Sequence, residues 1–361
     1  MTYYIDPDIK KAHVVIFYRN FTKLGLSHVG LGVNGKHTLT VLRRNHVRTD
    51  LFGIRFVRDL REILEKTPST THAIIEALWL TTNEVWDLCS EFPNVHFIIR
   101  AHSQIGFLQV EAGAVKQLRE QLVAQEAIPN LTMSANNTRM SNFLSRAYNV
   151  ECLFLPNLYD YQRMHPKRYE SHKHRALRIG SFGAIRILKN HSTAAAAALL
   201  AARELNCDLD FYMSVNREEQ GKGVLDAIRN MFSGLKWARL VESQWEPWPD
   251  FHRTVAHMDA CIQVSMSETF NLCSADATAE GVPSVVSSCI EWAPKSWFAD
   301  IDDAEDIARK LVYLLKSNTA AADGQEALRV FNQNAVTTWL RYLSRNPNLF
   351  GTEGIHHHLP R

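Results

Sequence analysis

Short apolar segments alternate with helical patterns along the first half of the chain, and this alternation restricts the fold more than any other feature. Five segments have the length and composition of buried strands, namely residues 14–18, 73–77, 96–100, 131–134 and 152–155. Helical patterns fall between them, at residues 27–45, 83–91 and 112–125. Because such alternation is typical of parallel βαβ units, the sequence predicts an α/β protein.

A second series of the same kind follows a polar stretch. Its predicted strands are residues 177–182, 209–213, 238–241, 260–264 and 284–286. Residues 161–176 are rich in His, Lys and Arg and have the character of a linker, and 361 residues suffice for two domains. The expected organisation is an N-terminal domain at 1–160, a linker at 161–176, a second domain at 177–335, and a C-terminal helix and tail at 336–361.

The composition argues against several classes of protein. No run of eighteen or more apolar residues is present, and the first residues lack the basic and then apolar profile of a secretory signal. The six cysteines are scattered without Cys-x-x-Cys pairs, as expected for free thiols in a reducing compartment. The sequence therefore predicts a cytoplasmic protein without a transmembrane segment, and it leaves the oligomeric state open.

Residues 265–288 combine two acids with a strand, loop, helix and strand pattern. Glu268 lies in the loop after the apolar run 260–264, and Asp276 lies in the short helix that follows. The carboxyl ends of parallel strands form the ligand edge of an open α/β sheet. Because carboxylates accept hydrogen bonds from hydroxyl groups, we expect a sugar or a ribose at this edge.

A glycine-containing loop opens the second domain. Gly183 lets backbone N–H groups approach a phosphate closely, and the N-terminus of the following helix adds positive potential. Arg186 and Lys189, in the same loop, carry the charges that a diphosphate requires. Taken alone, the loop also fits a helix cap with two surface cations.

The segment around Glu268 resembles the donor-site signature of retaining GT-B glycosyltransferases. In that signature a Ser precedes a Glu, a Phe-Gly pair follows, and a second Glu comes after seven intervening residues, ahead of Gly-Val-Pro. Glu268 and Phe270 match the first acid and the aromatic residue, whereas Asn271 stands for the Gly and Asp276 for the second Glu. Both replacements keep hydrogen-bonding character, which indicates a variant subfamily.

The resemblance implies a fold and a set of roles. The fold is two Rossmann-like domains that face each other across a cleft, with the last helix, here residues 336–343, packing back on the first domain. Glu268 would hold the transferred sugar and Asp276 the ribose. Arg186 and Lys189 would bind the diphosphate, and no metal or further cofactor is expected.

The same resemblance assigns the remaining candidate residues. His102, just after the strand at 96–100, matches a histidine beside the transferred sugar, although a histidine at the end of a strand is often structural. The other residues assigned to the nucleotide sugar are Gly183, Asn216, Phe270 and Asn271. It also assigns Gly30 and Gly32, from the glycine-rich loop after the first strand, to the acceptor side. The cations Arg43 and Arg44 are placed there by charge instead, because residues 36–61 are rich in Arg and contain few acids. This basic stretch fits either a solvated helix face or an acceptor-side surface for an anionic partner.

The implied reaction is metal-independent transfer of a sugar from a nucleoside diphosphate, with the anomeric configuration retained, to a saccharide or a lipid-linked glycan. Residues 1–175 contain 22 Lys and Arg against 16 Asp and Glu, an excess that leaves open a DNA acceptor, as in the DNA-modifying glycosyltransferases of bacteriophages. Two further alternatives are a GT-B protein that binds a nucleotide sugar without transferring it, and a nucleotide-sugar epimerase of the same architecture.

Overall fold

The computed structural model describes residues 11–20, 29–161, 164–165, 175–219, 221 and 223–344. The strands are β1 (His13–Arg19), β2 (Arg48–Ile54), β3 (His72–Glu76), β4 (His96–Ala101), β5 (Leu131–Ala135), β6 (Leu153–Phe154), β7 (Leu177–Ser181), β8 (Leu209–Ser214), β9 (Ala238–Ser243), β10 (Ala260–Gln263) and β11 (Ser284–Val286). The α-helices are α1 (Val29–Arg44), α2 (Val57–Lys66), α3 (Thr82–Glu91), α4 (Ile105–Leu108), α5 (Ala112–Ala124), α6 (Thr138–Tyr148), α7 (His191–Glu204), α8 (Val224–Phe232), α9 (Trp248–Ala256), α10 (Leu272–Ala279), α11 (Ala304–Lys316) and α12 (Ala320–Ser344). The 3₁₀ helices are η5 (Ile187–Lys189) and η6 (Lys295–Trp297).

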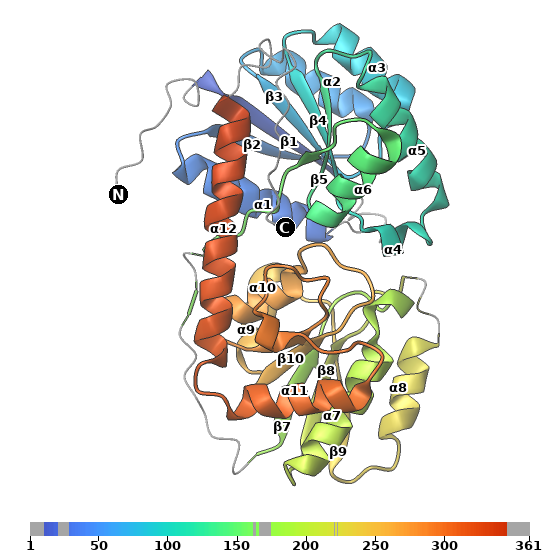
Figure 1. Cartoon of the computed structure of the whole chain (residues 1–361), viewed down its shortest axis with the longest axis vertical. Coiled ribbons are helices and arrows are strands. Elements are labelled where there is room, and N and C mark those ends of the chain that lie inside the picture. The colour runs from blue at the N-terminus through green and yellow to red at the C-terminus, as the bar shows by residue number, and fades with distance from the viewer. Residues whose placement is uncertain are drawn as a thin grey trace.

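The strands form two parallel sheets, one in each domain (Figure 1). The six-stranded sheet has the order β2-β1-β3-β4-β5-β6, and the five-stranded sheet has the order β11-β10-β7-β8-β9. The predicted α/β class with two Rossmann-like domains is confirmed. The strand order reverses between β1 and β3 and between β7 and β10, and ligands of open α/β sheets bind at such reversals.

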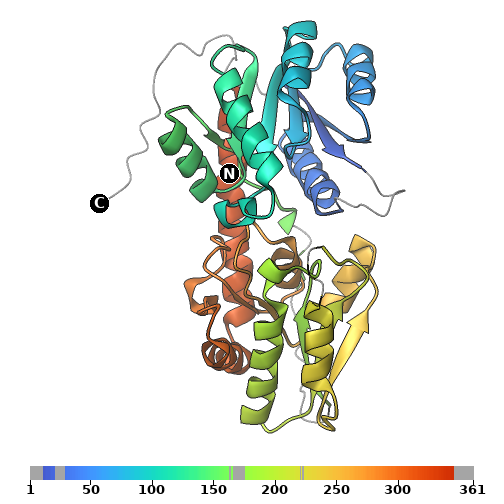
Figure 2. The same ribbon diagram turned by 90° about the vertical axis from the view of Figure 1, so that its right-hand side faces the viewer.

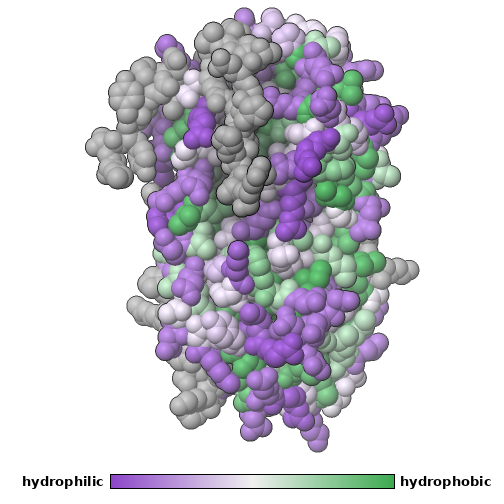
Figure 3. Space-filling view, in the orientation of Figure 1, coloured by the Kyte–Doolittle hydropathy of each residue, from purple (hydrophilic) through white to green (hydrophobic). Residues whose placement is uncertain are grey.

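Helices cover both faces of each sheet, which explains why the inner strands are buried along their whole length (Figures 1 and 2). All five residues of β3 are buried, and so are all six of β4. On the face of the molecule seen in Figure 3, hydrophilic residues predominate, and hydrophobic atoms are interspersed among them where the two domains meet.

Helix α12 runs alongside both domains (Figures 1 and 2). Leu328 in its first half belongs to the core of the second domain, whereas Trp339 in its second half is buried in the core of the first. The indole Nε1 of Trp339 donates a hydrogen bond to the carbonyl of Pro156 at 2.8 Å. The expected domain boundary at residue 336 thus falls inside one continuous helix.

Ser317 separates α11 from α12. Its extended backbone, with ψ of 132°, ends α11, and its hydroxyl accepts the backbone N–H groups of Thr319 and Ala320. This serine therefore satisfies the first backbone N–H group of α12. A glycine lets α12 approach the second domain closely, because a Cβ on Gly324 would lie 2.2 Å from the buried ring of Trp297.

Candidate active site between the two domains

A pocket between the two domains is lined by residues from both. The first domain contributes His102, Ser103, Gln104 and Phe107, and the second contributes Arg186, Leu188, Lys189, Ser267, Glu268 and Thr269. The four residues with predicted catalytic roles, Arg186, Lys189, Glu268 and His102, therefore line the same pocket. On the second domain the pocket is formed by the segments after β7 and β10, where the strand order of that sheet reverses.

Lys189 and Glu268 form a largely buried ion pair in this pocket. The Nζ of Lys189 donates a hydrogen bond to Oε1 of Glu268, and the side chains are only 16% and 13% exposed. The same Oε1 accepts a hydrogen bond from the hydroxyl of Ser265 at 3.2 Å. Gly183, with a φ of 119°, lies beneath the lysine, since a Cβ there would be 3.5 Å from its Cε. The loops after β7 and β10 thus place a cation and an acid side by side in the pocket.

Arg186 lines the same pocket, and its charge is balanced by an acid. Its Nε donates to Oε2 of Glu219 at 2.6 Å, and its guanidinium lies 5.3 Å from the ring centroid of Phe107 in the first domain. Burial opposes the charge on Glu219, but the neighbouring Arg186 and Arg217 outweigh it and lower the pKa of this carboxyl. An anionic ligand would compete with Glu219 for Arg186.

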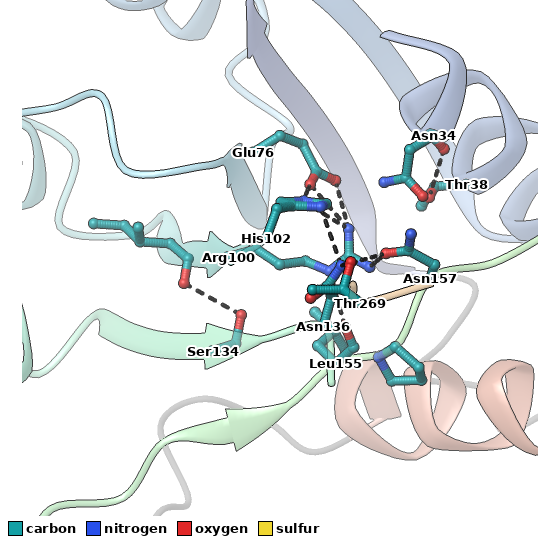
Figure 4. Close-up of polar contacts among 12 residues, drawn as sticks. Asn34, Thr38, Glu76, Arg100, His102, Ser134, Asn136, Leu155, Asn157 and Thr269 are labelled. Carbon is teal, nitrogen blue, oxygen red and sulfur yellow. Dashed lines mark hydrogen bonds and ion pairs between the residues drawn. The ribbon is translucent and has the colours of Figure 1, made fainter. Parts of the chain in front are cut away.

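His102 belongs to a buried polar cluster at the carboxyl edge of the first sheet (Figure 4). Its Nε2 is hydrogen-bonded to Oε2 of Glu76, and its Nδ1 lies 3.2 Å from Nδ2 of Asn136. Burial lowers the pKa of His102 despite the opposing effect of Glu76. A neutral ring that donates from Nε2 and accepts at Nδ1 satisfies both contacts. Both ring nitrogens are therefore engaged within the protein.

Arg100 is the centre of this cluster and is fully buried. It donates from Nε to the carbonyl of Leu155 at 2.8 Å and from Nη1 to Oε2 of Glu76 at 2.9 Å. Burial disfavours the charged form of Glu76, but Arg100 and His102 outweigh it and lower the pKa of Glu76 to about 2. Asn136 extends the cluster to the second domain, because its Nδ2 donates to Oγ1 of Thr269 at 3.1 Å. The wall behind the pocket is thus a charged network that links the two domains.

Comparison with family profiles and with curated protein sequences gives no match. Among solved structures, the chain is similar to a glycosyltransferase from Rickettsia africae, with a TM-score of 0.63, 12% identity, and coverage of 94% of this chain and 100% of that one. It is also similar to sucrose-phosphate synthase from Thermosynechococcus elongatus, with a TM-score of 0.64, 12% identity, and coverage of 91% and 98%. A third neighbour is HepE from Anabaena in complex with UDP-glucose, with a TM-score of 0.61, 12% identity, and coverage of 92% and 98%.

The chain has the GT-B fold. This confirms the fold that the residues around Glu268 indicated, and at 12% identity the likeness concerns the fold alone. In the GT-B fold the two Rossmann-like domains face each other across a cleft. The pocket that holds Lys189 and Glu268 has walls from both of these domains.

Two residues of the signature, Phe270 and Asn271, have structural contacts in this GT-B protein. Phe270 is buried, with its ring centroid 5.8 Å from that of Trp292. Asn271 has a left-handed backbone, with φ of 57°, and its side chain accepts the backbone N–H of Ser274 at 2.8 Å to cap α10. Asn is among the few residues besides Gly that adopt this conformation readily, which explains the replacement. Their roles in donor binding stay predictions.

Asp276, the second acid of the signature, does not line the pocket with Glu268. It is 2% exposed, and its carboxylate accepts hydrogen bonds from the hydroxyl of Tyr159 at 2.8 Å and from Nε1 of Trp248 at 3.2 Å. Nε2 of His252 lies 3.2 Å from the same carboxylate. These contacts join α9 and α10 to the segment that leads out of the first domain. The predicted contact of Asp276 with a ribose stays a prediction.

His252 gives this cluster a measurable pH dependence. Burial opposes its charge, but hydrogen bonds and charges from Asp276 and Glu280 outweigh it and raise the pKa of His252 to about 9. The protonated ring of His252 therefore stabilises the folded protein fully below pH 6.5, the ordinary pKa of a histidine, and this stabilisation is lost as the pH rises through 9. We expect the melting temperature of the wild type to fall over this interval by about 2–4 °C more than that of a His252→Asn variant. The expectation would be wrong if the melting temperatures of the two proteins changed by the same amount between pH 6.5 and pH 9.

Asn216 lies outside the pocket that holds Lys189. With a φ of 70°, it follows β8 and lines a second pocket with Gln244, Glu218 and Arg229. Its Nδ2 donates a hydrogen bond to Oε1 of Gln244. Its predicted contact with the nucleotide is not tested by these distances and stays a prediction.

The predicted acceptor-side residues lie on α1. Gly30 is exposed, and Gly32 packs near Tyr18, since a Cβ there would be 3.1 Å from the ring. Residues 25–28 of the glycine-rich loop lie outside the described residues. Arg43 donates to Asp50 at 3.0 Å, and Arg44 pairs with Asp160. Both cations are thus already paired within the protein.

The sequence did not single out Gln104, Phe107 or Ser267, which also line the pocket. In the sequence, only proximity to a predicted site residue could have indicated two of them, since Gln104 follows His102 by two residues and Ser267 directly precedes Glu268. Within the described ranges, no group of three or more His, Cys, Asp or Glu side chains could hold a metal ion. In the same ranges, no helix combines the length and the apolar character that crossing a membrane requires.

Proposed function

We propose that this chain is a retaining glycosyltransferase that moves a sugar from a nucleoside diphosphate to an acceptor hydroxyl. The observation that carries the proposal is one pocket that joins two cations, Arg186 and Lys189, with Glu268 and with His102 of the opposite domain. The cations match a diphosphate, and the acid matches sugar hydroxyls. The likeness in fold to a structure described as holding UDP-glucose supports the same donor class.

In the proposed reaction the bond between the anomeric carbon and the diphosphate oxygen breaks, and the acceptor oxygen bonds to that carbon on the same face. The acceptor proton passes to the departing phosphate oxygen. Arg186 and Lys189 stabilise the charge that grows there, so that no metal is required for this step. The hydrogen bonds from Lys189 and Ser265 both end on Oε1 of Glu268, and we assign Oε2 to a hydroxyl of the transferred sugar.

We propose a saccharide or a lipid-linked glycan as the acceptor rather than DNA. DNA binding uses Lys and Arg side chains to neutralise phosphates. Arg43 and Arg44, the predicted acceptor-side cations, are paired with Asp50 and Asp160, so a DNA phosphate would have to compete with these carboxylates. No contact among the described residues favours a DNA acceptor.

A donor screen by thermal shift tests the donor site. UDP, GDP and ADP, with UDP-glucose, GDP-mannose and ADP-glucose, are added to the wild type and to Arg186→Ala, with and without EDTA. We expect one nucleotide to raise the melting temperature of the wild type in both buffers, because a ligand at 100 times its Kd adds about 2.7 kcal/mol to stability. This shift is expected to disappear in Arg186→Ala, which lacks the guanidinium for the diphosphate.

An Arg146→Ala variant is the matched control, since Arg146 is exposed on α6. It should respond like the wild type. A protein that no nucleotide stabilises would overturn the proposed function. Binding of the nucleotide sugar without transfer to any of the saccharides, lipid-linked glycans or DNA offered in parallel would favour the non-catalytic alternative.

A further inference from the structure

Two side chains of the pocket have polar atoms that are shielded from solvent and lack a hydrogen-bond partner. Among the described residues, neither Nε2 of Gln104 nor Oγ of Ser267 has a partner. Gln104 is only 6% exposed, and both residues line the pocket. Buried polar groups in folded proteins are nearly always hydrogen-bonded, so two such atoms in one pocket indicate where a ligand binds.

The two side chains come from opposite walls of the pocket. Gln104 directly precedes α4 in the first domain, whereas Ser267 lies in the loop after β10 in the second. The walls meet at this point, since a Cβ on Gly106 would lie 3.4 Å from Oγ of Ser267. A ligand that reaches both atoms therefore contacts both domains.

The chemistry of these atoms differs from that of the neighbouring cations. An amide N–H and a hydroxyl are neutral, and they pair well with the hydroxyl groups of a sugar. Arg186 and Lys189, which carry full charges, suit the diphosphate. The pocket thus has a charged part and a neutral polar part side by side.

We propose that Gln104 and Ser267 bind hydroxyl groups of the transferred sugar and determine which sugar the protein accepts. The proposal rests on the proposed function. It assigns recognition of the nucleoside diphosphate to Arg186 and Lys189, and recognition of the sugar to a pair of residues that spans the two domains. A site that hydrogen-bonds a substrate hydroxyl discriminates strongly against analogues that lack it.

The proposal is tested by measuring, with calorimetry, how tightly ligands bind to the Gln104→Leu and Ser267→Ala variants. Two probes are used, a free nucleotide and the matching nucleotide sugar. They are the pair that stabilises the wild type in the donor screen, chosen from UDP with UDP-glucose, GDP with GDP-mannose, and ADP with ADP-glucose. Each variant is expected to bind the nucleotide sugar about tenfold more weakly, because one hydrogen bond of typical strength corresponds to a factor of this size. Binding of the free nucleotide should stay within about twofold of the wild type, a change of under 0.5 kcal/mol.

Deoxy analogues of the nucleotide sugar locate the contact. The analogue that lacks the hydroxyl bound by Gln104 should bind the wild type more weakly, yet it should lose no further affinity in Gln104→Leu, since the two changes remove the same interaction. Gln109→Leu is the matched control, because Gln109 is exposed at the other end of α4. It should bind every probe like the wild type.

Stability separates a binding role from a structural one. Because Nε2 of Gln104 has no partner within the described chain, Gln104→Leu should unfold, without ligand, at the temperature of the wild type or above. Equal weakening of nucleotide and nucleotide sugar, unchanged binding of both, or a lowered melting temperature of Gln104→Leu would overturn the proposal. If the wild type binds no nucleotide at all, the proposed function fails, and this proposal fails with it.

Discussion

A Lys189→Ala variant is expected to transfer sugar about 10²–10³-fold more slowly than the wild type while keeping its fold, since removing one group that stabilises transition-state charge has an effect of this size. The Lys189 ammonium lies in the pocket beside Glu268 and is 16% exposed. When the diphosphate departs, this ammonium is the charge that we expect to meet the developing negative oxygen. Release of the free nucleotide in the presence of an acceptor measures the effect.

Two further variants make this test specific. Lys189→Arg keeps the charge but changes the shape of the cation, so it should recover part of the lost activity. Lys316→Ala removes an exposed lysine at the end of α11 and should leave transfer unchanged. Turnover of Lys189→Ala within about threefold of the wild type, a difference of under 1 kcal/mol in barrier height, would show that the lysine has no such role.

Arg100→Leu is expected to lower the free energy of unfolding by about 3–5 kcal/mol, because removing one partner of a buried pair leaves the other charge uncompensated. The arginine and Glu76 are both fully buried, and Arg100 also holds the carbonyl of Leu155. Urea denaturation followed by circular dichroism measures the change.

The control is Arg146→Leu, on the exposed face of α6, which should change stability by no more than about 0.5 kcal/mol. Replacing Glu76 and Arg100 together by Leu should be less harmful than the sum of the two single changes, since the double variant leaves no unpaired charge. A midpoint for Arg100→Leu that matches the wild type would show that water compensates Glu76.

The fold was largely predictable because most strands of a parallel sheet covered on both faces are continuous apolar runs. The predicted strand at residues 96–100 is β4, and that at 260–264 is β10, each within one residue of its end. β2 and α2 were not among the predicted elements. Among the described strands, β2 (Arg48–Ile54) lies at the edge of the sheet beside β1, and it mixes exposed Arg48 with buried residues, so it shows no apolar run.

The candidate site was predictable where position along the chain determines position in the sheet. Arg186 and Lys189 follow β7, and Glu268 follows β10, so their convergence follows from the strand order. The environment of Asp276 was not predictable in this way. Its partner Tyr159 is 117 positions away in a segment without a motif, and only the packing of α10 against that segment brings them together.

The course of α12 along both domains limits which parts of this chain can be exchanged with those of another protein. A fragment ending at residue 160 would lack Trp339, which is buried in the core of the first domain. A fragment starting at residue 177 would lack Tyr159, which belongs to the core of the second. Neither half of the chain therefore encodes a complete interior. A chimera that exchanges one half of this chain for that of another GT-B protein must therefore also supply matching parts of α12 and of the segment around Tyr159.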